Sequence, residues 1–140
     1  MTPYWLRKVT TLEPKDPHDD NPIINRRAPS GMPVRQAAVL VLFGGSPTPD
    51  PLARGGLPAD ADVLLTQRAA TLRQHSGQVA FPGGAADPDD EGPEHTALRE
   101  AQEETGLDPA GVRPLAVLPE LFIPPSGFDV TPVIAYWDRP

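Results

Sequence analysis

Residues 97–108, ALREAQEETGLD, place three glutamates and an arginine on one short stretch with helical character. Successive residues of a helix are rotated by about 100°, so Glu100 and Glu104 lie one above the other and Glu103 flanks them. Like charges at this spacing destabilise a helix by about 0.2–0.5 kcal/mol per pair. The stretch is therefore either a solvated acidic surface or a site for a hard cation such as Mg²⁺, which prefers carboxylate oxygens.

The flanking residues predict where this helix begins and ends. We expect it to run from about Glu94 to Thr105. Pro93 suits the first helical position, and Gly106 stands where a helix-terminating glycine belongs. The small apolar residues that begin at Ala97 would allow the helix to pack closely on a sheet.

Apolar runs on both sides of the helix predict β-strands. These runs lie at 36–43, 62–68, 78–81, 112–121 and 129–137. Turn-forming residues predict loops at 44–60, 83–93 and 122–128, and a short helical turn is expected near Trp5. Strands before and after one helix predict an α+β fold. Residues 1–34 are polar and proline-rich, so we expect an N-terminal arm before a domain over 35–140.

Composition limits the classes of function. A chain of 140 residues suits one domain. A net charge of −7 and a pI near 4.8 argue against nucleic-acid binding, which depends on a surplus of Lys and Arg. The sequence has no cysteine and no apolar run near the roughly 18 residues of a membrane span. These features are typical of a cytoplasmic protein that binds no membrane.

The wider segment FPGGAADPDDEGPEHTALREAQEETGL, 81–107, resembles the Nudix box. That motif reads Gly, five residues, Glu, seven residues, then Arg-Glu-apolar-x-Glu-Glu-x-Gly-apolar. The second half is met at every fixed position, from Arg99 to Leu107. The first half departs from the pattern, because Glu91 has the right distance to Arg99 but Ala85 stands where its glycine belongs. Aligning Gly84 instead makes the loop one residue longer.

The acids of that longer loop have two interpretations. Asp87, Asp89 and Asp90 would be either outer-sphere ligands of a cation or, as we expect, a solvated acidic loop.

Segments on either side of the box resemble one branch of the family, the coenzyme A pyrophosphatases. The upstream segment is LLTQRAATLRQHSGQVAFPGG, 64–84, and the downstream one is LPELFIPPSGFDVTPVIAYW, 118–137. The resemblance covers residues 36–137. It implies hydrolysis of the pyrophosphate bond of coenzyme A or its derivatives, giving 4′-phosphopantetheine and adenosine 3′,5′-bisphosphate.

The resemblance also implies a fold and a set of site residues. The fold would be an α/β/α sandwich around a mixed sheet, with a loop–helix–loop box over about 84–107. Catalytic roles would fall to Glu100, Glu103, Glu104 and Arg99. The Mg²⁺ or Mn²⁺ ligands would be Glu100, Glu104, Glu103 and the carbonyl of Gly84. Substrate contacts would come from Arg68, Arg73, Gly83, Gly84 and Phe128.

Three alternatives stay open at the level of sequence. The same fold acting on ADP-ribose, NADH or a nucleoside triphosphate would keep every box residue. A non-catalytic Nudix-like binding module is expected to lose box acids, which this chain retains. Family members continue beyond YWDRP, 136–140, with further sheet and a helix, so the chain is either a C-terminally truncated piece or a homodimer whose partner supplies the missing layer.

Overall fold

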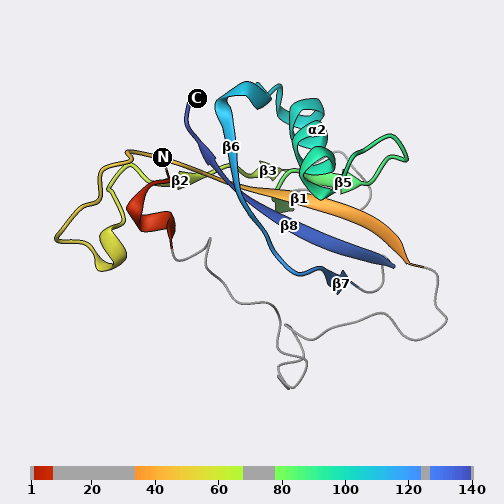
Figure 1. The fold of residues 1–140 in the computed structure, drawn as a ribbon, viewed down its shortest axis with the longest axis horizontal. Helices are drawn as coiled ribbons and strands as arrows, with labels where there is room; N and C mark the ends of the chain where they lie inside the picture. Colours follow the sequence, from red (N-terminus) through yellow and green to blue (C-terminus); the bar gives the residue numbers. More distant parts are fainter. Residues whose placement is uncertain (1, 8–33, 68–77, 124–126, 140) are drawn as a thin grey trace, which may run out of the picture.

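A mixed six-stranded sheet forms the centre of the protein in the computed structural model, which describes residues 2–7, 34–67, 78–123 and 127–139. The two long central strands are β1 (Arg35–Gly44) and β8 (Phe128–Trp137), which pair in parallel. The shorter strands of this sheet are β2 (Asp62–Val63), β5 (Gly83–Ala85), β6 (Val112–Val117) and β7 (Leu121–Ile123). Strands β2 and β5 run antiparallel to β1, and β6 and β7 run antiparallel to β8 (Figure 1). A separate two-stranded ribbon joins β3 (Thr66–Gln67) to β4 (Val79–Ala80).

One α-helix of the described residues, α2 (Pro93–Thr105), packs on one face of this sheet (Figure 1). The shorter 3₁₀ helices are η1 (Tyr4–Leu6), η2 (Arg54–Gly56) and η3 (Pro109–Gly111). The predicted α+β class and the mixed sheet are confirmed. No helix of the described residues is long and apolar enough to cross a membrane.

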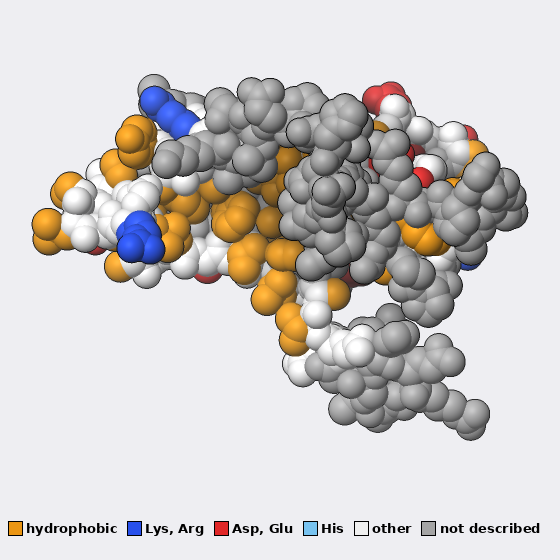
Figure 2. Space-filling view, turned by 90° about the horizontal axis from the view of Figure 1, so that it is seen from below, with side chains coloured by type: hydrophobic (Ala, Val, Ile, Leu, Met, Phe, Trp, Pro, Cys, Tyr) orange, Lys and Arg blue, Asp and Glu red, His pale blue; other side chains and the backbone are white. Residues whose placement is uncertain are grey.

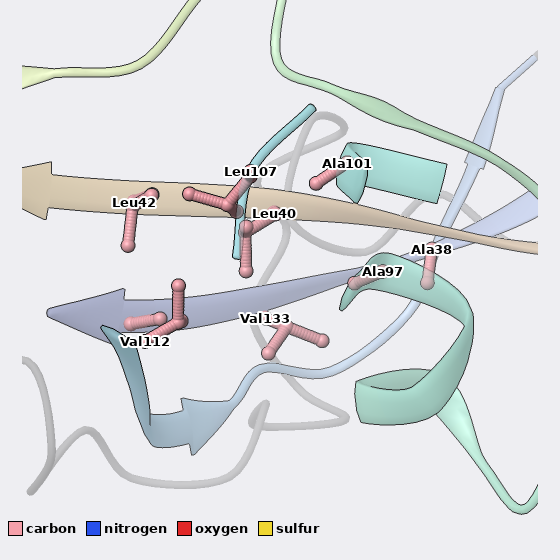
Figure 3. Close-up of a cluster of buried hydrophobic side chains, with 9 residues drawn as sticks. Ala38, Leu40, Leu42, Ala97, Ala101, Leu107, Val112 and Val133 are labelled. Carbon is pink, nitrogen blue, oxygen red and sulfur yellow. The ribbon is translucent and has the colours of Figure 1, made fainter. Parts of the chain in front are cut away.

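The core lies between α2 and the central strands. Side chains alternate across a strand, so every second residue of β1 faces the helix. Leu40 and Leu42 are fully buried there, and Ala97 and Ala101 present the helix face that meets them (Figure 3). Two alanines on that face let the helix backbone approach the sheet closely. The neighbouring helix side chains therefore lie close to β5.

Hydrophobic side chains also gather on the side of the sheet away from α2 (Figure 2). Trp5 of η1 packs edge-to-face against Phe43 and Tyr136, with ring centroids 6.3 Å apart in both pairs. Leu6 is buried, with 2% of its surface exposed. The predicted helical turn near Trp5 is confirmed. Trp5 and Leu6 attach this turn to the rest of the domain. The arm over 1–34 and the domain boundary after it stay predictions.

Two predicted strands are wrong in their extent. The strand expected at 62–68 is divided into β2 and β3, because the Leu64 N–H bonds to the Leu42 carbonyl while Thr66 pairs with β4. Residue 68 lies outside the described residues. The strand expected at 112–121 is divided into β6 and β7, because Pro119 has no N–H to continue the ladder.

The predicted loop at 83–93 is wrong at its start. Gly83–Ala85 form β5, which pairs with β1 so that Gly84 lies opposite Ala38. Glycine has little intrinsic strand preference, and tertiary pairing with a long buried strand overrides that preference here. This strand forms part of the candidate site, because acidic side chains of α2 lie against it.

Candidate active site

Helix α2 brings two of the three predicted glutamates, Glu100 and Glu104, to β5. The helix starts with Pro93 and ends at Gly106, whose φ of 74° is left-handed and whose N–H bonds to the Gln102 carbonyl. The predicted bounds are confirmed. With Ala97 and Ala101 against the sheet, the helical rotation turns Glu100 and Glu104 toward the β5 backbone.

The closest approach is between Glu100 and Gly84. A β-carbon at position 84 would lie 2.5 Å from Cδ of Glu100 and 2.7 and 2.8 Å from its two oxygens. The carboxylate therefore occupies the space that any other residue at 84 would fill. Glu104 approaches the neighbouring residue, and its carboxylate accepts a hydrogen bond from the Gly83 N–H. The two helix acids thus lie on consecutive glycines of one edge strand.

Arg99 fixes the acids from the other side. Its Nη1 lies 3.1 Å from Oε1 of Glu100 and 3.3 Å from Oε1 of Glu103. Its Nη2 donates to the Ala85 carbonyl at 3.1 Å, which ties the guanidinium to the end of β5. These contacts are charge-assisted hydrogen bonds, through which Arg99 can orient both glutamates.

Asp90 is the residue that sequence reasoning missed. Its oxygens accept a fork of two hydrogen bonds from Arg99, Nε to Oδ1 and Nη2 to Oδ2, both at 3.0 Å. The side chain of Asp90 is 4% exposed, so the expectation of a solvated acidic loop is wrong at this position. Glu91, in contrast, is exposed, and no ion pair of the described residues involves it.

The sequence spacing of the first half of the box could have identified Asp90 as a candidate partner of Arg99. Five residues separate Gly84 from Asp90, as the first half of the box requires, and the extra residue falls between Asp90 and Arg99. Aspartate is one methylene shorter than glutamate. The loop folds Asp90 inward with the Asp87 N–H on its Oδ2 at 2.9 Å and the Thr96 hydroxyl on the same oxygen at 2.8 Å.

The charges around Arg99 move the pKa values of the site in opposite directions. The Arg99 guanidinium holds the pKa of Asp90 well below its usual range, and Asp90 in turn raises the pKa of Arg99. Burial raises the pKa of Glu104, and the charges of Glu100 and Glu103 add to that rise, while the Gly83 N–H opposes it. The Asp90–Arg99 pair is therefore ionised at neutral pH, whereas Glu104 has a reason to attract a cation.

The structure brings the residues predicted to bind a metal together only in part. Within the described ranges, no three acidic or histidine side chains converge on one point in a metal-ligating arrangement. Glu103 is the reason, because its carboxylate is turned toward Arg99 and its side chain is 59% exposed. Glu100 and Glu104 supply hard carboxylate oxygens beside the backbone of Gly83 and Gly84, which suits Mg²⁺ or Mn²⁺.

The predicted substrate residues are only partly described. Arg68 and Arg73 lie outside the described residues. Gly83 and Gly84 form β5 under the helix acids. Phe128 begins β8, and the Arg35 guanidinium lies 4.5 Å from its ring centroid. An open hollow of about 810 Å³ lies beside α2, and Leu98, Arg99 and Val117 are among the residues that line it.

Comparison with known proteins assigns the family. A sequence model of the NUDIX domain matches residues 49–137. The chain belongs to the NUDIX domain family. It is 52% identical over 109 residues to an uncharacterized Nudix hydrolase NudL of Pectobacterium atrosepticum, which covers 76% of this chain and 50% of the relative. It is 48% identical over 131 residues to NudL of Salmonella paratyphi B, covering 94% of this chain and 56% of the relative. The chain thus spans about half the length of the curated relatives it matches.

Solved structures confirm the Nudix fold. The crystal structure of a Nudix hydrolase from M. smegmatis, RenU, superposes with a TM-score of 0.54 at 33% identity, over 76% of this chain and 63% of that one. The C. elegans Ap4A hydrolase superposes with a TM-score of 0.52 at 21% identity, over 76% and 70%, which supports the fold alone. The second helical layer of the predicted sandwich has no counterpart within the described part of the chain.

Proposed function

We propose that this Nudix domain hydrolyses a pyrophosphate bond with the help of Mg²⁺ or Mn²⁺, and that coenzyme A or a derivative is the substrate. One observation carries the first part: two glutamates one helical turn apart lie against consecutive glycines of an edge strand. That arrangement places two carboxylate groups together at one edge of the sheet, as a hydrated cation shared with a substrate phosphate requires.

Glu100 and Glu104 would be the main metal ligands, and the Gly84 carbonyl and Glu103 would complete the set. The fit has electrostatic support: burial raises the pKa of Glu104, repulsion from Glu100 and Glu103 adds to the rise, and a cation relieves that repulsion. When bound, such an ion neutralises charge on diphosphate oxygens and lowers the pKa of an attacking water.

The residues of the chain itself would have separate roles in the reaction. Arg99 holds Glu100 in place at 3.1 Å, so this carboxylate is pre-oriented before substrate arrives. Arg99 also keeps Glu103 within 3.3 Å. Glu103, the most exposed of the residues bonded to Arg99, is our candidate for the base that takes a proton from the attacking water. Because its hydrogen bonds to Arg99 are long, it can turn toward the substrate at little cost.

The substrate assignment depends on the sequence flanking the box. The segment 64–84 resembles the coenzyme A pyrophosphatase branch, whereas the box residues serve only the metal and the diphosphate. Arg68 and Arg73 in that segment would pair with substrate phosphates, since the arginine fork suits two phosphate oxygens at once. Phe128 would contribute an aromatic surface, with one ring face already stacked on Arg35.

Product analysis tests both parts. The protein is offered coenzyme A, ADP-ribose, NADH and a nucleoside triphosphate in parallel with Mg²⁺ or Mn²⁺, beside a Glu104→Gln control. Release of 4′-phosphopantetheine and adenosine 3′,5′-bisphosphate, lost in the control, is the expected result. Preference for another diphosphate would keep the metal site and reject the substrate. Absence of turnover with all four compounds would reject the proposed activity.

A further inference from the structure

Thr96 is a buried polar residue on α2 that no step above uses. It is 1% exposed, and its hydroxyl lies 2.8 Å from Oδ2 of Asp90 and 3.2 Å from the carbonyl of Gly92. A threonine hydroxyl has one proton to donate. The nearer acceptor is also the charged one, so the hydroxyl donates to Asp90.

Asp90 depends on its hydrogen-bond donors because water hardly reaches it. A buried carboxylate is tolerated when its lone pairs are satisfied. Oδ1 accepts from Nε of Arg99, and Oδ2 accepts from Nη2 of Arg99, from the Asp87 N–H and from Thr96. The Thr96 hydroxyl supplies one of these four bonds and Arg99 supplies two, so three of the four come from α2, the helix that carries Glu100 and Glu104.

We propose that Thr96 is a positioning residue that acts through Asp90 on Arg99, and through Arg99 on Glu100 and Glu103. Three hydrogen-bonded contacts connect the hydroxyl to the acids: 2.8 Å to Asp90, 3.0 Å from Asp90 to Arg99, and 3.1 Å from Arg99 to Glu100. Asp90 lies on the loop, while the other three residues lie on α2. The Thr96 hydroxyl therefore fixes the loop to the helix at the point where the arginine fork is set. The consequence for metal binding rests on the proposed function.

A neighbouring cavity determines how Thr96 is best tested. The cavity has a volume of about 220 Å³, and Asp90, Thr96 and Thr131 line it. A smaller residue at 96 would let water enter from the cavity and replace the hydroxyl. Thr96→Val keeps the shape and removes only the donor. Thr131→Val is the matched control, because Thr131 is 7% exposed, lines the same cavity, and has a hydroxyl that makes no hydrogen bond within the described part of the chain.

The experiment compares the wild type with Thr96→Val, Thr96→Ser and Thr131→Val. The first measurement is the Arg99 Nε–H resonance in ¹⁵N NMR spectra of the metal-free protein. The second is Mn²⁺ affinity from the EPR signal of free Mn²⁺. We expect Thr96→Val to shift and broaden the resonance and to weaken Mn²⁺ binding about five-fold, below the ~10–100-fold typical for direct partners of metal ligands. Thr96→Ser restores both values, and Thr131→Val changes neither.

The outcomes separate this inference from the proposed function. A Thr96→Val protein with a lower melting temperature but unchanged resonance and Mn²⁺ affinity would show a purely structural role and overturn the inference. If the wild type binds no Mn²⁺, the proposed function fails, and the Arg99 resonance alone decides whether Thr96 sets the arginine. Should Thr96→Val not fold, Thr96→Cys replaces it in the same two measurements, because a thiol fills most of the space but is only a weak donor; an unchanged resonance again counts against the inference.

Discussion

Replacing Gly84 by alanine should separate metal binding from folding, because the three atoms nearest to the new β-carbon all belong to the end of one flexible side chain. It would lie 2.5 Å from Cδ of Glu100, and ordinary contact begins at 3.4 Å, so the carboxylate must move by about 0.9 Å. Gly84 does not have a left-handed backbone, so alanine adds no strain there. We expect the free energy of unfolding to stay within about 1 kcal/mol of wild type, since loss of glycine flexibility in the unfolded chain offsets the shift of Glu100.

The catalytic cost should be far larger than the cost in stability. A displacement of about 1 Å at a reacting geometry can cost about 100-fold in rate, equivalent to about 2.7 kcal/mol of barrier. The assay is kcat/KM for the best diphosphate substrate with saturating Mn²⁺, alongside Mn²⁺ affinity and urea unfolding. We expect kcat/KM to fall by about two orders of magnitude and Mn²⁺ affinity to fall with it.

Two other glycines provide matched controls. A β-carbon at Gly83 would overlap the carbonyl oxygen of Ala38, which is backbone and cannot move aside, so Gly83→Ala should unfold at markedly lower urea. A β-carbon at Gly92 would meet nothing within 4 Å, and its φ of 165° is extended backbone, so Gly92→Ala should keep both stability and activity. A Gly84→Ala protein with wild-type kcat/KM and Mn²⁺ affinity would refute the assignment of Glu100 as a ligand beside Gly84.

Three further predictions follow from single contacts. Leu40→Ala should lower the free energy of unfolding by about 2–5 kcal/mol in urea titrations, because Leu40 is fully buried in the core; a loss below about 1 kcal/mol would contradict this core. Burial raises the pKa of Glu104, so Mn²⁺ affinity measured by EPR should fall with decreasing pH, with a midpoint above the usual glutamate pKa of about 4.3. A midpoint below that value would count against Glu104 as a ligand. Arg99 lowers the pKa of Asp90, so the pair stabilises the fold fully above about pH 4 and progressively less as the pH falls. Below about pH 4, the free energy of unfolding in urea should therefore fall more steeply with pH for wild type than for Asp90→Asn. Equal pH dependence in the two proteins would disprove the coupling.

The acidic helix was predictable because its information is local. Pro93, the spacing of Glu100 and Glu104, and Gly106 act within one helical segment, where a rotation of about 100° per residue decides which side chains share a face. The same holds for β1, whose apolar run predicts a buried strand. The family followed from the order of a few charged residues and one glycine, which needs no knowledge of the sheet.

Other features depended on partners distant in sequence. Gly83–Ala85 form a strand only because β1 offers its edge, since glycine-rich sequence carries no strand preference of its own. The choice of Asp90 over Glu91 as the partner of Arg99 was decided by which carboxylate the loop turns inward, a question of burial that spacing alone could not answer.

The sequence by itself therefore determined the acidic helix, the family and the chemical type of the site. Only the tertiary structure decided which carboxylate holds Arg99, that Thr96 donates to it, and that Glu100 fills the space beside Gly84. The physical reason is the difference in range. Helical periodicity is fixed by backbone geometry over a few residues, whereas the pairing of buried charges is fixed by packing between a helix, a loop and an edge strand that come together only in the folded chain.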